Sequence, residues 1–266
     1  MNLNENSLLT PRQSEILEIA RDRGRVDIDT LAGGFGVTPQ TIRKDVNELS
    51  DRGLLHRIHG GAVYPSNVAN YGYDSRRFLA ADEKAAIGER AAALIPDNSS
   101  IILNIGTTTE QVAMALRGRR GIMAITNNLN VANILREAQD ISVIIAGGMV
   151  RPSDGGIVGE ATIDLIRQFR VDFAVIGASA IDEGGAILDF DYREVKVAQA
   201  IIQNARRTIL VADHTKFTRN APVRIGQLAD MDFFVTDREP PEPVRELCQA
   251  HGVSIEIARP VESPAA

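Results

Sequence analysis

Cysteine is nearly absent from this chain of 266 residues: Cys248 is the single one, so no internal disulfide can form. No apolar run reaches the length needed to span a membrane. The first ten residues lack a basic start followed by an apolar stretch, so we expect no secretory signal. These absences favour a reducing compartment, and we expect a cytoplasmic protein. The composition, 44% hydrophobic and 24% charged, is that of a globular chain able to bury its own core.

Sequence signatures of catalysis, metal binding and common cofactors are also missing. The four histidines do not have the spacing of metal ligands. No nucleophile elbow, Walker loop or dinucleotide fingerprint occurs, and Gly147-Gly148 does not begin a GxGxxG motif. We expect no cofactor, no metal and no catalytic residue, and a protein that is not an enzyme.

An excess of positive charge is absent too. The formal net charge is −6, and the first 65 residues hold eight Lys/Arg against nine Asp/Glu. On bulk charge alone this argues against a nucleic-acid-binding protein. The basic side chains gather locally, however, at Arg43, Lys44, His56, Arg57 and His59. A case for DNA binding must therefore rest on the geometry of this segment.

The segment Val37–Leu49 has the pattern of a short helix with one polar face. Thr38 suits the N-cap and Pro39 the first helical position, and Val37 can contact Ile42 as a hydrophobic staple. Ile42, Val46 and Leu49 fall on one inward stripe. The outward positions are Gln40, Thr41, Arg43, Lys44 and Asn47, whose polar and cationic side chains suit base edges and phosphates. The residues expected to contact DNA are Thr38, Gln40, Thr41, Arg43 and Lys44.

The surrounding sequence predicts a winged helix-turn-helix domain over residues 1–63. A capping box at Thr10–Gln13 begins a first helix, and a second short helix runs from Asp27 to Gly36. After the third helix, Leu54–Ile58 and the following Gly60-Gly61 predict a hairpin. Arg57 and His59 on this wing are expected to contact the DNA backbone. Residues 64–81, with little periodicity, are interpreted as a linker.

From residue 82 to 258, strand-like runs alternate with helical patterns, which predicts a mostly parallel sheet covered on both faces. The expected strands are Ile101–Ile105, Ile122–Ile125, Ser142–Ala146, Phe173–Gly177, Thr208–Ala212, Phe233–Thr236 and Val253–Ile257. The expected helices are Asp82–Ile95, Thr109–Leu116, Leu129–Ala138, Glu160–Phe169, Arg193–Ala205 and Pro243–His251. Residues 259–266 are expected to be a frayed tail.

Polar side chains and glycines follow the carboxyl ends of several predicted strands, where ligands bind in open parallel sheets. Gly106-Thr107-Thr108 can hold an anion at a helix N-terminus, or be a plain turn with a threonine cap. Asn127 and Asn128 offer donors and acceptors for hydroxyls, or are turn residues that cap the next helix. Gly147 and Gly148 fit either a pocket or a structural turn. Asp213 and Lys216 can hold a phosphate and a hydroxyl, perform proton transfer, or form a surface ion pair.

These segments together resemble a known family. Pro39–Leu49 with His59–Ala62 is similar to the DNA-binding signature of DeoR-type bacterial repressors. Four later segments resemble the effector domain of that family in the same order: Ile105–Thr108, Thr126–Asn128, Ala146–Gly148 and Asp213–Phe217. The resemblance implies an effector domain with the fold of ribose-5-phosphate isomerase that binds a phosphorylated sugar or polyol.

The resemblance also implies roles for residues. Gly106, Thr107 and Thr108 would hold the phosphate, and Lys216 would be a second cation for the ligand. The pocket would be lined by Asn127, Asn128, Gly147 and Gly148, with Glu194 and Lys196 near it. Three segments resemble the branch of the family that responds to glycerol 3-phosphate: Thr126–Asn133, Asp154–Thr162 and Phe190–Val195. One departure is Asn104, where the family often has Asp, and another is Thr215, commonly Ser.

The sequence therefore predicts a homo-oligomeric repressor of carbohydrate or glycerol genes. Its N-terminal domain would bind double-stranded operator DNA, and a phosphorylated effector would shift its conformation and release the DNA. One alternative is a sugar-phosphate isomerase-like enzyme with an accessory helix domain, although a fold does not carry activity with it. Another is a winged helix that binds a protein, which would lack a steep salt dependence of DNA binding.

Overall fold

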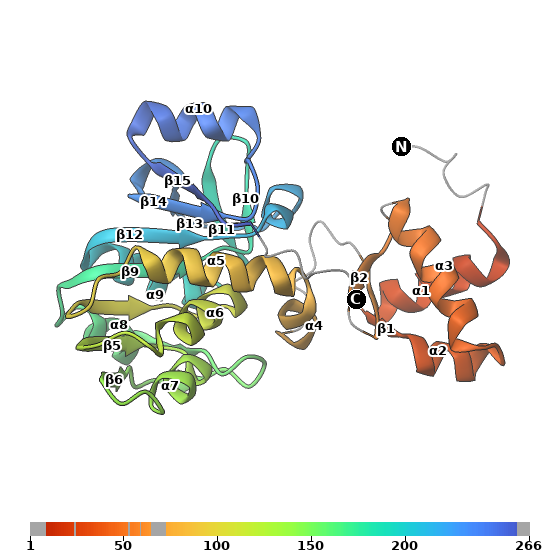
Figure 1. Cartoon of the computed structure of the whole chain (residues 1–266), viewed down its shortest axis with the longest axis horizontal. Coiled ribbons are helices and arrows are strands. Elements are labelled where there is room, and N and C mark those ends of the chain that lie inside the picture. The colour runs from red at the N-terminus through yellow and green to blue at the C-terminus, as the bar shows by residue number, and fades with distance from the viewer. Residues whose placement is uncertain (1–8, 24, 53, 59, 65–72, 260–266) are drawn as a thin grey trace. The chain divides into compact units, whose positions relative to one another are not determined.

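The computed structural model describes residues 9–23, 25–52, 54–58, 60–64 and 73–259 (Figure 1). The chain forms two compact units, residues 1–80 and residues 81–266. His59 lies outside the described residues, as do parts of the proposed linker and tail. No helix in the described ranges is long and apolar enough to cross a membrane.

The first unit is a winged helix-turn-helix. Its helices are α1 (Pro11–Arg23), α2 (Ile28–Phe35), α3 (Pro39–Asp51) and α4 (Tyr73–Phe78). Its strands β1 (Arg25–Asp27), β2 (His56–Ile58) and β3 (Gly61–Val63) form an antiparallel sheet in the order β1-β3-β2. The predicted stripe of Ile42, Val46 and Leu49 is buried in one core with Ile16 and Leu55.

Side-chain caps fix where these helices begin. Thr10 and Gln13 form the predicted capping box, with each side chain accepting the other's backbone N–H at 3.1 and 3.2 Å. The Asp27 carboxylate accepts from the backbone of residues 29 and 30 at the start of α2. Thr38 caps α3 by accepting from Thr41 N, as predicted. Each cap satisfies donors that a helix start leaves unpaired.

Two features of this unit differ from the prediction. The short strand β1 precedes α2, where no strand was expected, because Arg25–Asp27 pairs with Gly61–Val63 of the wing. Helix α4 lies within residues 64–81, which the prediction treated as a linker with little periodicity. Both elements are too short for periodicity to detect.

The second unit is built on a parallel sheet of seven strands in the order β15-β14-β12-β9-β4-β5-β6. All six neighbouring pairs are parallel. The strands are β4 (Ser100–Leu103), β5 (Ile122–Thr126), β6 (Ile141–Ile145), β9 (Val171–Gly177), β12 (Ala205–Val211), β14 (Phe233–Thr236) and β15 (Ser254–Ile257). These match the seven predicted runs, so the mostly parallel α/β fold is confirmed.

Helices cover both faces of this sheet, because successive strand residues point to opposite sides. On one face, Leu103 and Val175 pack against helices α5 (Ala81–Ala93), α6 (Thr107–Leu116) and α7 (Leu129–Leu135). On the other face, Ile102 and Ala174 pack against α8 (Glu160–Ile166), α9 (Tyr192–Gln203) and α10 (Glu242–His251). Figure 1 shows α5 lying beside α6 along the sheet.

Shorter elements surround this framework and were not predicted. Strands β7 (Met149–Val150) and β8 (Ile157–Val158) form a hairpin. A small antiparallel sheet consists of β10 (Ala180–Ile181), β11 (Ala186–Asp189) and β13 (Val223–Gln227). Two 3-10 turns, η2 (His214–Thr218) and η3 (Leu228–Asp230), follow β12 and β13.

Candidate functional site

The outward face of α3 is exposed and polar. Thr38, Gln40, Arg43 and Lys44 are exposed, and Thr41 is half-buried. Within the described chain, the Arg43 side chain makes no hydrogen bond or ion pair. Lys44 Nζ lies 3.9 Å from Glu48 Oε1, one helical turn away and largely in solvent, so this pair is weak. The hydroxyl groups of Thr38 and Thr41 are hydrogen-bonded to each other at 2.9 Å as part of the helix cap.

Two polar contacts that the sequence did not reveal hold α3 against α1. Arg12 Nε lies 2.5 Å from Asp45 Oδ2, and Asp45 is buried. Gln13 Nε2 donates to Glu48 Oε2 at 2.6 Å. They join residues more than thirty positions apart, which spacing along one helix cannot show. These contacts fix the orientation of α3 behind its exposed face.

The wing presents Arg57 to solvent. Arg57 is exposed in β2 and pairs in register with Ala62 of β3. The second predicted wing contact, His59, falls outside the described residues. Arg57 and the exposed side chains of α3 therefore form the described part of the predicted DNA interface.

The parallel register of the second unit brings the predicted ligand segments to one edge of the sheet. Leu103 of β4 pairs with Thr126 of β5 and with Val175 of β9. Val211 of β12 pairs with Gly177 at the end of β9. The loops after these strands therefore emerge together. This carboxyl edge holds Asn104, Gly106–Thr108, Asn127 and Asp213–Lys216.

At this edge, α6 begins directly after β4. Gly106 is the residue before the helix and has φ of +147°, a conformation that favours glycine. Thr107 and Thr108 are buried in the first turn. Thr109 Oγ1 donates to the carbonyls of Asn104 and Gly106 at 2.9 and 2.7 Å, which secures the turn. The first N–H groups of α6 can therefore receive an anion.

The two asparagines after β5 have different roles. Asn128 caps α7 by accepting from Asn130 N, and its amide donates to Glu110, so its structural alternative is supported. Asn127 Nδ2 donates to Ile157 O at 3.1 Å, which fixes the orientation of the amide. Its Oδ1 is buried and has no hydrogen-bond partner among the described residues, and Asn104 Oδ1 is in the same state. Both oxygens require donors.

The two glycines after β6 differ in their surroundings. A Cβ on Gly148, which has φ of +151°, would lie 2.3 Å from Thr162 Oγ1 and 2.9 Å from Val158 O, so packing favours the structural alternative there. A Cβ on Gly147 would meet no atom of the described residues within 4 Å, although the Gly147 carbonyl accepts from Thr162 Oγ1 at 2.8 Å. Both glycines are exposed. Packing therefore accounts for Gly148 and does not account for Gly147.

After β12, Asp213 and Lys216 form the ion pair expected as the alternative, with Nζ and Oδ2 3.8 Å apart, but the pair is buried and does not lie at the surface. Burial alone would raise the pKa of Asp213, but Lys216, Lys84 and hydrogen bonds from Thr215 lower it to about 2. Lys84, on α5, is itself buried and was not predicted. Its spacing of three, four and seven residues before Ile87, Gly88 and Ala91 places it on the same inward stripe, which could have revealed it.

Glu194 belongs to a neighbouring ionic cluster. Arg151 donates to Glu194 at 2.6 Å, to Asp191 at 3.1 Å and twice to Asp154. Burial opposes the charge, but Asp154 and Glu194 hold the pKa of Arg151 above its ordinary value. The cluster fastens the loop between β7 and β8 to the start of α9. Lys196 does not join it: its side chain is exposed, with Nζ 5.2 Å from the centre of the Tyr192 ring.

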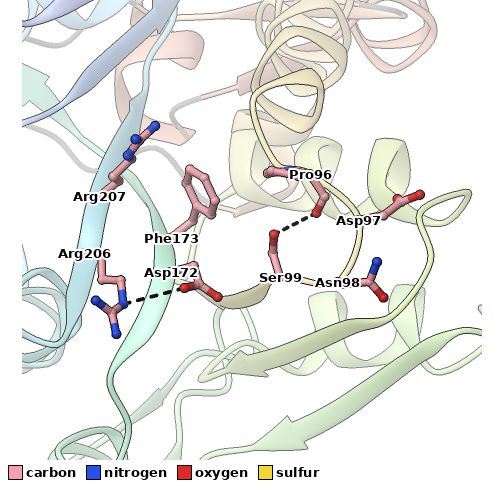
Figure 2. A pocket seen from close by; sticks show the side chains of 8 residues that line it. All are labelled: Pro96, Asp97, Asn98, Ser99, Asp172, Phe173, Arg206 and Arg207. Carbon is pink, nitrogen blue, oxygen red and sulfur yellow. Dashed lines mark hydrogen bonds and ion pairs between the residues drawn. The ribbon is translucent and has the colours of Figure 1, made fainter.

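A hollow of about 480 Å³ lies at the opposite, amino edge of the sheet (Figure 2). It is lined by Pro96, Asp97, Asn98, Ser99, Asp172, Phe173, Arg206 and Arg207. Its main polar groups are already paired: Ser99 Oγ donates to Pro96 O at 2.8 Å, and Asp172 accepts from Ser100 and lies 3.6 Å from Arg206. It is therefore distinct from the predicted ligand loops.

An exposed, capped helix beside a wing, joined to an α/β unit with buried polar groups at its carboxyl edge, defines a helix-turn-helix regulator with a sensor domain. Family models agree: a DeoR-like helix-turn-helix domain matches residues 12–68, and a DeoR C terminal sensor domain matches residues 79–238. The chain belongs to the DeoR family of transcriptional regulators.

Its relatives are named as repressors. The chain is 44% identical to the glycerol-3-phosphate regulon repressor of Escherichia coli (strain K12), over 93% of this chain and 98% of that protein. It is 39% identical to the HTH-type transcriptional repressor CsqR of the same strain, over 95% and 96%. The protein is thus a regulator, and the isomerase alternative is wrong. Among solved structures, ribose 5 phosphate isomerase A from Neisseria gonorrhoeae matches with a TM-score of 0.39 and 16% identity, over 52% of this chain and 55% of that one.

Proposed function

We propose that this protein represses genes of glycerol or carbohydrate metabolism and leaves its operator when a phosphorylated polyol or sugar binds the carboxyl edge of its parallel sheet. Glycerol 3-phosphate is the first candidate, because a repressor of the glycerol-3-phosphate regulon is 44% identical to this chain. The DNA contacts are assigned to α3 and the wing, through Thr38, Gln40, Thr41, Arg43, Lys44, Arg57 and His59.

The proposal that a ligand binds here rests on one observation: unpaired buried acceptors and a buried lysine lie at the same edge of the sheet. Asn127 Oδ1 and Asn104 Oδ1 need donors, which ligand hydroxyls supply. Lys216 and the N–H groups at Gly106–Thr108 suit a phosphate. Asn128, Gly147, Gly148 and Glu194 support the walls of this site, and Lys196 is assigned to its outer rim.

We also propose that the protein binds DNA as a homo-oligomer, since two recognition helices that contact two half-sites multiply the affinity of one. A nearly complete release requires the ligand to prefer the released state by about 5.5 kcal/mol. One small phosphate per subunit supplies that most readily when several subunits respond together.

The test begins with a duplex selected by the protein from a randomised DNA pool. Fluorescence anisotropy then follows release of the labelled duplex during titration with glycerol 3-phosphate, ribose 5-phosphate and unphosphorylated glycerol. We expect release by a phosphorylated compound and none by glycerol. The proposal fails if no phosphorylated metabolite changes operator affinity.

A further inference from the structure

Lys84 is a buried charge that the predicted ligand set does not include. It stands in the first turn of α5 with 2% of its surface exposed. Lysine is rarely buried to this degree unless its ammonium group interacts with an opposite charge or with hydrogen-bond acceptors. The question is therefore what this ammonium group faces.

The direction of α5 places Lys84 at the carboxyl edge of the sheet. The helix ends at Ala93, and the chain then passes through Pro96–Ser99 to the amino end of β4. Its 13 residues span about 20 Å, so its first turn lies near the opposite edge. This edge is where the ligand loops emerge.

Close packing against α6 fixes the lateral position. A Cβ on Gly88 would lie 2.6 Å from the backbone of Gln111, so the two helices touch there. Lys84 is one turn before Gly88, and Thr107 is one turn before Gln111. Since both helices run away from the carboxyl edge, Lys84 lies beside the start of α6.

Lys84 shares the carboxylate of Asp213 with Lys216. Both lysines act on this buried group, whose Oδ2 has no hydrogen-bond partner among the described residues. One carboxylate and two ammonium groups sum to one positive charge, and the N-terminus of α6 beside them adds a partial positive charge. A phosphate ester, with a charge of about −1.5 to −2 at pH 7, would be attracted to this combination.

We propose that Lys84 binds the anionic group of the effector together with Lys216 and the N-terminus of α6, and that it transmits occupancy to the segment before α5. This rests on the proposed function. Transmission follows from position: Lys84 is four residues from Ala80, the last residue of the first unit. Ala80 has φ of +52°, a strained conformation for a residue with a side chain, which suits a hinge.

The test uses the full chain and the selected duplex, with Lys84→Met beside Arg90→Met. Arg90 is on the same helix, is half exposed and pairs with Glu256, so its variant makes the same charge change away from the site. Without ligand, both variants should bind the duplex as wild type does. Lys84→Met should need at least about tenfold more glycerol 3-phosphate for half release, while Arg90→Met stays within about twofold of wild type. Inorganic phosphate is titrated as the probe of the anion alone.

Lys84→Arg separates ligand contact from a structural role. It keeps the charge, so it should lose less sensitivity to glycerol 3-phosphate than Lys84→Met. If both variants lower the melting temperature yet release at the wild-type concentration, Lys84 is structural and the inference is overturned. If saturating ligand releases Lys84→Met as completely as wild type, the transmission half is overturned. A wild-type complex that ignores every phosphorylated compound refutes the proposed function instead.

Discussion

Arg43 and Lys44 are neighbours on α3 with different surroundings. Arg43 is unpaired within the described chain, whereas Lys44 lies near Glu48 and is 79% exposed. A guanidinium group can contact a guanine with two hydrogen bonds, and an ammonium group acts on phosphate as a point charge. We expect Arg43→Ala to cost about 1–3 kcal/mol of operator affinity and to relax sequence preference. Lys44→Ala should weaken all duplexes alike.

Anisotropy titrations over a series of salt concentrations distinguish these roles. Each variant is measured on the selected duplex and on duplexes with single base-pair changes. Lys44→Ala should lower the slope of log affinity against log salt by about one. Equal losses for Arg43→Ala on every duplex would assign Arg43 to the backbone and refute the base contact.

Asp213 should make stability depend on pH. Its pKa is lowered from 3.8 to about 2 in the folded protein. A carboxylate with a lower folded pKa adds stability that is complete above about pH 4 and is lost as pH falls through about 2. The contribution is about 2 kcal/mol. Asp213→Asn should flatten the fall in unfolding free energy over this window, whereas Glu246→Gln, at an exposed position, should leave the slope unchanged.

Denaturant unfolding at pH 7 and at pH 2.5 gives the two required free energies. At pH 7, Asp213→Asn should be destabilised by about 3–5 kcal/mol, because two buried lysines lose their carboxylate. A loss that is the same at both pH values would show that the Asp213 charge is not the cause.

The junction between α4 and α5 contains a residue with a strained backbone conformation, and glycine substitutions can test this strain. Ala80 has φ of +52° before α5 begins, while Ala85 is inside the helix. Glycine removes the strain at the first position and weakens the helix at the second. We expect Ala80→Gly to be neutral or stabilising by up to about 1 kcal/mol, and Ala85→Gly to cost about 0.5–1 kcal/mol. Thermal melts of both variants measure this, and equal destabilisation would contradict the strained junction.

The long elements could be predicted because each carries its own periodic signal. Most of the seven parallel strands contain a run of apolar residues, and Thr38 with Pro39 marks the start of α3. The strands that were not predicted have two to five residues, and each forms because it pairs with another strand. For example, β1 forms because Arg25–Asp27 pairs with the wing.

The candidate site was predictable only where it follows strand ends. Asn127 and Lys216 lie two and four residues after the ends of predicted strands, so their meeting follows from parallel topology. Lys84 and Arg151 reach this region from other elements, and their partners lie far along the chain. Contacts of that kind depend on tertiary packing, which local patterns do not encode. The same reason hid the Arg12–Asp45 contact behind α3.

The whole molecule has separate cores for its two units. The first unit buries Ile16, Ile42 and Leu49 in one cluster. The second unit buries one large cluster on each face of its parallel sheet. None of these three clusters takes residues from both units. The sensor unit, residues 81–266, therefore contains what it needs to fold alone.

We expect the fragment 81–266 to unfold cooperatively and to bind glycerol 3-phosphate as the full chain does, while failing to bind operator DNA. At a ligand concentration one hundredfold above Kd, binding should add about 2.7 kcal/mol to its stability. Calorimetry of the fragment and of the full chain, with and without ligand, measures this, and glycerol is the matched control. Equal affinities would show that the site is complete within the sensor unit. A weaker fragment would contradict this expectation and show that the segment before Ala81 takes part in ligand binding.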